Sequence, residues 1–81
     1  MRITVLTFAR LRELVGTGSQ TIELPEGSTA QHLWTALAQR HGGIAELAES
    51  TRVAVNGRIV EFAQPLRQGD EVALLPPVGG G

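Results

Sequence analysis

Residues 28–43, STAQHLWTALAQRHGG, contain the pattern that decides the fold. Apolar and small residues recur there with helical spacing, at Ala30, Leu33, Trp34, Leu37 and Ala38. This spacing predicts an amphipathic helix over 29–41, with its apolar stripe packed on a sheet. Ser28, with Gln31 three residues later, matches a capping box that starts the helix, and Gly42-Gly43 is a natural stop.

The segments on both sides of this helix alternate between apolar and polar residues, as strands do. The expected strands are 2–8, 19–24, 53–55, 59–60 and 71–75. The stretch 9–15 is expected to form a short helical or irregular turn, so that the first two strands form an antiparallel pair. Residues 44–49 are expected to add one further helical turn. Asn56-Gly57 predicts a tight hairpin, because both residues tolerate positive φ.

Strand parity divides the expected sheet into a covered face and an open face, since one helix covers only one face. The first and last strands should pair in parallel and lie centrally. The residues expected under the helix are Ile3, Val5, Val72 and Leu74. Those expected on the open face are Leu6, Phe8, Ile59, Ala73 and Leu75. Such an apolar patch marks a partner surface unless the 9–18 loop shields it, and Arg10, Arg12 and Arg58 are candidate charges at its rim.

Length and composition limit the possible classes of protein. The chain has 81 residues, which predicts one packed domain over 1–77 followed by a flexible glycine tail over 78–81. It contains no cysteine, which excludes disulfides, thiolate metal sites and a cysteine nucleophile. The net charge of −1 gives no basic footprint for nucleic acid. There is no apolar run long enough for a membrane helix, and we expect a cytoplasmic protein.

The sequence offers no self-sufficient active site between the first strand and the last. His32 and His41 lie on opposite sides of the helix and cannot share a metal ion, so no metal site is expected. The remaining chemical group is the α-carboxylate of Gly81. Gly79 and Gly80 have no Cβ, so this tail could thread a tunnel that bulkier residues could not enter.

Three segments together resemble the MoaD family, the ubiquitin-like small, sulfur-carrier subunit of molybdopterin synthase. They are VLTFARLREL at 5–14, VAVN at 53–56 and GDEVALLPPVGGG at 69–81. The resemblance covers essentially the whole chain, and its last block is the most specific part. It implies an α+β, ubiquitin-like β-grasp fold, in which a mixed sheet carries one main helix on one face.

The resemblance also implies a chemistry and a set of partners. A MoeB-type adenylating enzyme would consume ATP to form an acyl-adenylate at Gly81, and a sulfur-relay protein would convert it to a thiocarboxylate. The large synthase subunit would then insert this sulfur into cyclic pyranopterin monophosphate. The chain itself would bind no cofactor and catalyse nothing alone. The residues implied in docking are Phe8, Ile59, Leu75, Pro76, Pro77 and Val78.

The sequence leaves two alternatives open. The same carrier chemistry could serve another acceptor, in thiamine thiazole formation, tRNA thiolation or cysteine synthesis. The chain could instead be a ubiquitin-like modifier that forms isopeptides, or a plain interaction module. Sulfur transfer and conjugation change the intact mass of the chain differently, so mass measurement separates them.

Overall fold

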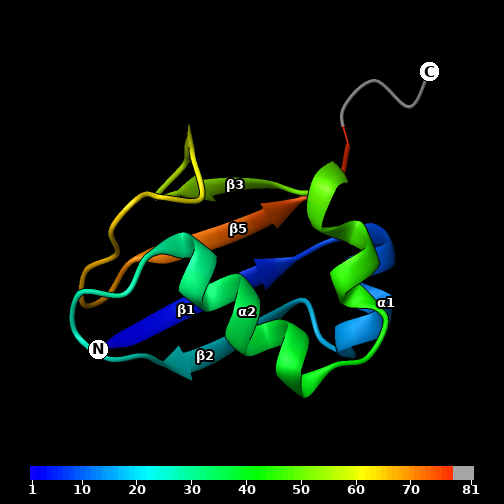
Figure 1. Ribbon diagram of the computed structural model, residues 1–81, viewed down its shortest axis with the longest axis horizontal. Helices are drawn as coiled ribbons and strands as arrows, with labels where there is room; N and C mark the ends of the chain where they lie inside the picture. Colours follow the sequence, from blue (N-terminus) through cyan, green and yellow to red (C-terminus); the bar gives the residue numbers. More distant parts are fainter. Residues whose placement is uncertain (78–81) are drawn as a thin grey trace.

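The computed structural model describes residues 1–77, which form a five-stranded sheet with helices on one of its faces (Figure 1). The strands are β1 (Arg2–Thr7), β2 (Ser19–Glu23), β3 (Arg52–Val55), β4 (Arg58–Val60) and β5 (Glu71–Leu75). The helices are α1 (Ala9–Val15), α2 (Ala30–Arg40) and the 3-10 helix η1 (Ile44–Ser50). The predicted flexible tail, 78–81, lies outside the described residues.

The sheet has the order β2-β1-β5-β3-β4, with β5 in the middle. Strands β1 and β5 pair in parallel, and the other neighbouring pairs are antiparallel. The predicted parallel pairing of the first and last strands is therefore confirmed. The β3–β4 turn contains Asn56 at φ 51 and Gly57 at φ 83, which are the two positive values that the Asn-Gly hairpin requires.

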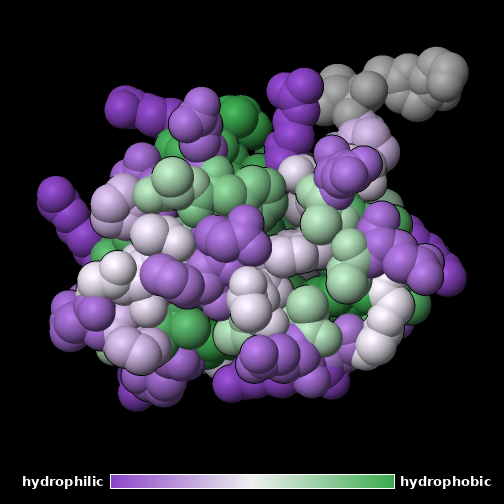
Figure 2. All heavy atoms as spheres, viewed as in Figure 1, coloured by the Kyte–Doolittle hydropathy of each residue, from purple (hydrophilic) through white to green (hydrophobic). Residues whose placement is uncertain are grey.

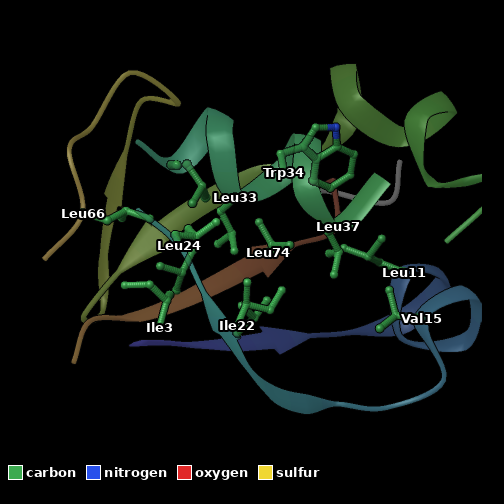
Figure 3. Close-up of a cluster of buried hydrophobic side chains, with 14 of the residues drawn as sticks. Ile3, Leu11, Val15, Ile22, Leu24, Leu33, Trp34, Leu37, Leu66 and Leu74 are labelled. Atoms are coloured by element: carbon green, nitrogen blue, oxygen red, sulfur yellow. The ribbon is translucent and has the colours of Figure 1, made fainter. Parts of the chain in front are cut away.

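The core lies between the sheet and α2, and its composition confirms the predicted strand parity. Ile3, Val5, Val72 and Leu74 are completely buried on the covered face. Four of the five predicted stripe residues of α2 are buried, and Ala38 is half-buried. In Figure 3 the side chains of Leu33 and Leu37 point from α2 towards the strands. Helix α1 adds Leu11 and Val15 to the same core.

The capping box of α2 begins one residue later than predicted. Thr29 is the N-cap: its hydroxyl accepts a hydrogen bond from the His32 backbone N–H at 3.3 Å. The His32 Nδ1 atom accepts from the Thr29 N–H at 2.9 Å, so an imidazole replaces the usual Glu or Gln. Ser28 is unavailable as the cap because its buried hydroxyl donates to the Pro25 carbonyl at 2.8 Å. The prediction that Ser28 and Gln31 form the box is wrong.

The other end of α2 also differs in detail from the expectation. The helix ends at Arg40, and His41 follows in an extended conformation. The left-handed glycine is Gly43, at φ 90, which precedes η1. This glycine therefore redirects the chain into η1, whose Ile44 is completely buried in the core.

Trp34 is the largest side chain of the α2 stripe, and it gives the first test of this packing. The side chain is 5% exposed and meets Phe62 edge-on, with ring centroids 6.3 Å apart. Trp34→Ala is expected to lower the free energy of unfolding by about 3–5 kcal/mol, since it removes a large buried ring. Denaturant unfolding measures the loss, and Thr35→Ala on the exposed side of α2 is the control. A loss below about 1 kcal/mol would contradict burial of the ring.

Candidate functional site

The end of β5 organises the candidate site, because this strand leads directly to the tail. Its ladder with β1 ends at the pair Thr7 and Leu74, and its ladder with β3 ends at Arg52 and Leu75. Pro76 and Pro77 follow, and both are exposed. Proline has no N–H to donate, so the pairing stops at this point. The predicted site residues Val78, Gly79, Gly80 and Gly81 lie outside the described residues.

The start of β5 is held by a hydrogen-bonded latch between the Asn56 turn and the 67–70 loop. The Asn56 side chain donates to Asp70 Oδ1 at 2.9 Å and accepts from the Glu71 N–H at 2.9 Å. Asp70 Oδ2 accepts from the Arg67 N–H at 2.8 Å. Two of the segments that resemble the MoaD family therefore meet here. Their role in this structure is to fix the position of β5.

An apolar row crosses the open face of the sheet. The register places Leu6 beside Ala73, Ala73 beside Ala54, and Ala54 beside Ile59, so these side chains share one face. Ile59 is 55% exposed and lies on the edge strand β4. Leu11 and Val15 of helix α1 join the core. Within the row, Leu6 and Ala73 are half-buried and Ala54 is buried. The predicted apolar open face is thus present in the structure.

The surface on the covered side of the molecule is more mixed in polarity than the apolar row. Figure 2 shows the side that carries α2 and η1, where hydrophilic and weakly apolar residues are mixed and strongly apolar ones are visible in small groups. Of the predicted rim charges, Arg10 pairs with Glu13 at 3.3 Å. Arg58 stands beside Val55 in the row that contains the buried Val72, so it belongs to the covered face.

Most of the predicted docking residues line a small hollow at the root of the tail, the Pro76-Pro77 step. Its volume is about 60 Å³, and it lies between the start of α1, the end of η1 and the end of β5. Its walls include Phe8, Ala9, Leu47, Leu75, Pro76 and Pro77. Phe8 is 42% exposed. Ile59 is not among the lining residues, and the open-face row connects it with β5.

Sequence reasoning missed Ala9 and Leu47 as members of this hollow, and Arg52 as a charge beside it. Leu47 follows the buried Ile44 by three residues, a spacing that only indicates a helical face. Arg52 stands opposite Leu75 on the open face, where Arg58 had been expected to contribute. These placements depend on how η1 and β3 pack, which the local pattern does not reveal.

Other kinds of site find no support in the described part of the chain. Within residues 1–77, no group of three or more His, Cys, Asp or Glu side chains is placed to hold a metal ion. His32 belongs to the capping box. None of the helices formed by these residues combines the length and the apolar character needed to cross a bilayer.

The sequence comparison decides the family. The ThiS family matches residues 5–81, which is nearly the whole chain. The chain belongs to the ThiS family. The molybdopterin synthase sulfur carrier subunit of Escherichia coli K12 is 41% identical, with 98% of this chain and 99% of that protein covered. The human protein of the same name is 36% identical, with 99% and 94% covered. These relatives confirm the predicted resemblance to MoaD.

Solved structures confirm the ubiquitin-like β-grasp fold of this family member. A Pyrococcus furiosus protein named as molybdopterin converting factor subunit 1 superposes with a TM-score of 0.88 at 35% identity, over 96% of this chain and 99% of that one. SAMP1 of Haloferax volcanii gives 0.83 at 28% identity, with both chains fully covered. A complex of subunits 1 and 2 of the Helicobacter pylori molybdopterin-converting factor gives 0.70 at 27% identity, again with full coverage.

The latch at the start of β5 can be tested by a double-mutant cycle. Asn56→Gly keeps the positive φ and removes the amide, and Asp70→Ala removes its partner. Each change is expected to lower the free energy of unfolding by about 1 kcal/mol, because each removes two exposed hydrogen bonds. The double variant should lose less than the sum, since the two side chains bond to each other. Strictly additive losses in denaturant unfolding would show that the hydrogen bond between Asn56 and Asp70 contributes no coupling energy.

Proposed function

We propose that this chain is the sulfur carrier subunit of a molybdopterin synthase, and that the carboxylate of Gly81 carries the sulfur. The observation that carries the proposal is the full-length match to proteins of that name, at 41% identity for Escherichia coli. The fold supports it, because β5 runs through the middle of the sheet and ends in two exposed prolines immediately before the tail.

The chemistry of a carboxylate explains why the carrier would need other proteins. A carboxylate is a poor electrophile, so it must first displace pyrophosphate from ATP to become an acyl-adenylate. A sulfur nucleophile at the oxidation level of sulfide then attacks the carbonyl carbon, and AMP leaves. The product is a thiocarboxylate, a soft nucleophile. We expect this chain to bind no cofactor and to catalyse neither step alone.

Three partners follow from this sequence of steps. The adenylating enzyme is of the MoeB type, a relay protein delivers the sulfur, and the large synthase subunit uses it on cyclic pyranopterin monophosphate. The Helicobacter pylori complex of subunits 1 and 2 supports the large subunit as a partner. We expect this chemistry to take place in the cytoplasm, where ATP is available. No nucleic acid or membrane takes part in the scheme.

The docking surface for these partners is the open face together with the hollow at the root of the tail. Its apolar members Phe8, Ile59 and Leu75 are exposed or half-buried, whereas the covered face is filled by α2. A partner that buries this patch would gain the apolar contacts that dominate many interfaces. It would also hold the tail in place, because Leu75 is joined to Gly81 by only five residues.

Protein modification is the second candidate function. A Haloferax volcanii protein described as small archaeal modifier protein 1 resembles this chain at a TM-score of 0.81 and 27% identity. A modifier shares the acyl-adenylate and differs in the attacking nucleophile, an amine in place of sulfur. Intact mass after incubation with ATP, the adenylating enzyme and a sulfur donor decides between them. Exchange of one oxygen for sulfur supports the carrier, and attachment to a second protein supports the modifier.

The position and the thinness of the tail are tested by two variants. Deletion of Gly81 moves the reactive carbonyl back by about 3.3–3.6 Å along an extended chain, and Gly80→Val adds a branched Cβ in a tunnel shaped for glycine. Sulfur loading should fall to near background in both, since a shift of about 1 Å can cost a hundredfold. Both changes lie beyond the core, so the free energy of unfolding should change by less than about 0.5 kcal/mol. Wild-type loading of both variants would contradict the proposal.

The docking surface is tested by introducing charge into the patch. Phe8→Glu and Leu75→Glu should leave the isolated chain folded, because neither side chain belongs to the core. Each should weaken binding to the large subunit by about 2 kcal/mol or more, as expected for a hot spot. Gln39→Glu adds the same charge on the exposed side of α2 and is the matched control. Unchanged affinity, measured by titration calorimetry, would place the interface elsewhere.

A further inference from the structure

Ala9, the first residue of α1, has a left-handed backbone with φ 50. Among the non-glycine residues of 1–77, Asn56 alone shares a positive φ. Asparagine tolerates this conformation in an Asn-Gly turn, whereas alanine has no side-chain group that can stabilise it. For an L-residue the conformation costs about 1–2 kcal/mol. The contacts around Ala9 must therefore hold it there.

The contacts that hold Ala9 come from residues before it and after it in the chain. Before it, the Thr7 N–H donates to the Gly18 carbonyl at 3.1 Å, and the Thr7 hydroxyl donates to the Thr17 carbonyl. After it, Leu11 is buried in the core on the covered side. Phe8 lies between these anchors in an extended conformation and remains 42% exposed. The left-handed corner thus lets α1 turn into the core while Phe8 stays outside it.

The placement of Phe8 against the root of the tail is not set by the sheet. The ladder between β1 and β5 ends at Thr7 and Leu74, one residue before Phe8 and Leu75. Beyond that pair, both chain segments line the hollow, with Phe8 and Ala9 from the first and Pro76 and Pro77 from the second. The backbone conformation of Ala9 therefore fixes the direction of the chain next to Phe8.

We propose that Ala9 is a positioning residue for partner binding, because its left-handed backbone places the Phe8 ring beside the Pro76-Pro77 step. Phe8 and the root of the tail then form one apolar surface for the protein that takes up residues 78–81. The inference rests on the proposed function for the identity of that protein, the large synthase subunit. Ala9 also lines the hollow, but the proposed effect comes from its backbone conformation and is exerted through Phe8.

The test compares substitutions that permit or disfavour positive φ at this exposed position. Ala9→Gly permits it, and Ala9→Val disfavours it strongly because valine is β-branched. Ala9→Gly should keep the wild-type affinity for the large subunit. Ala9→Val should raise the half-saturating concentration about tenfold, because the binding-competent fraction falls. The rate of sulfur transfer at saturation is measured separately, and the loss is expected in the half-saturating concentration rather than in that rate. Ala45→Gly and Ala45→Val make the same changes at an exposed residue of η1 that lacks a positive φ.

A double-mutant cycle shows whether Ala9 acts through Phe8. Phe8→Ala should weaken binding in the wild-type chain and have little further effect in the Ala9→Val chain. Circular dichroism at the assay temperature must show every variant folded, and Ala9→Leu replaces Ala9→Val if valine prevents folding. A wild-type chain that does not bind the large subunit overturns both the proposed function and this inference. A wild-type chain that binds, with Ala9→Val binding equally tightly or the cycle strictly additive, overturns this inference alone.

Discussion

The parallel pairing of β1 with β5 is the constraint on which the rest of the structure depends. It sets the first strand beside the last in the middle of the sheet. Its covered side supplies four completely buried residues to the core, Ile3, Val5, Val72 and Leu74. Its open side supplies Leu6 and Ala73 to the apolar row. The same pairing brings the ends of β1 and β5 together at Thr7 and Leu74. The positive φ of Ala9 then sets the course of the chain around Phe8, one residue beyond that pair.

Much of this arrangement could be predicted from the sequence because strand parity and helical spacing are local periodicities. The covered and open faces follow from an alternation of two, and the α2 stripe follows from a period of 3.6. The cap of α2 was missed because Ser28 is engaged with Pro25 and an imidazole serves as the acceptor at His32. The positive φ of Ala9 could not be predicted, since it is imposed by anchors at Thr7 and Leu11 and not by the residue itself.

The packed domain and the reactive end of the chain have separate roles in the proposed chemistry. The domain offers a rigid core, an apolar face and a fixed direction for its last strand, while the reactive group of the proposal lies four residues beyond Pro77. The latch of Asn56 and Asp70 secures the opposite end of β5. A carrier that visits several enzymes benefits from this separation, because one recognition surface can serve partners that perform different reactions on the same carboxylate.

The central place of β5 also bears on how the chain folds. Thr4 and Glu71 are paired in the finished sheet although most of the chain separates them. Closing so long a loop carries an entropic cost before any contact offsets it, and topologies rich in distant pairs fold slowly. The β1–β2 pair and α2 involve only nearby residues and can form early. The docking surface includes the ends of both strands, so it is complete only in a chain whose first and last strands have paired.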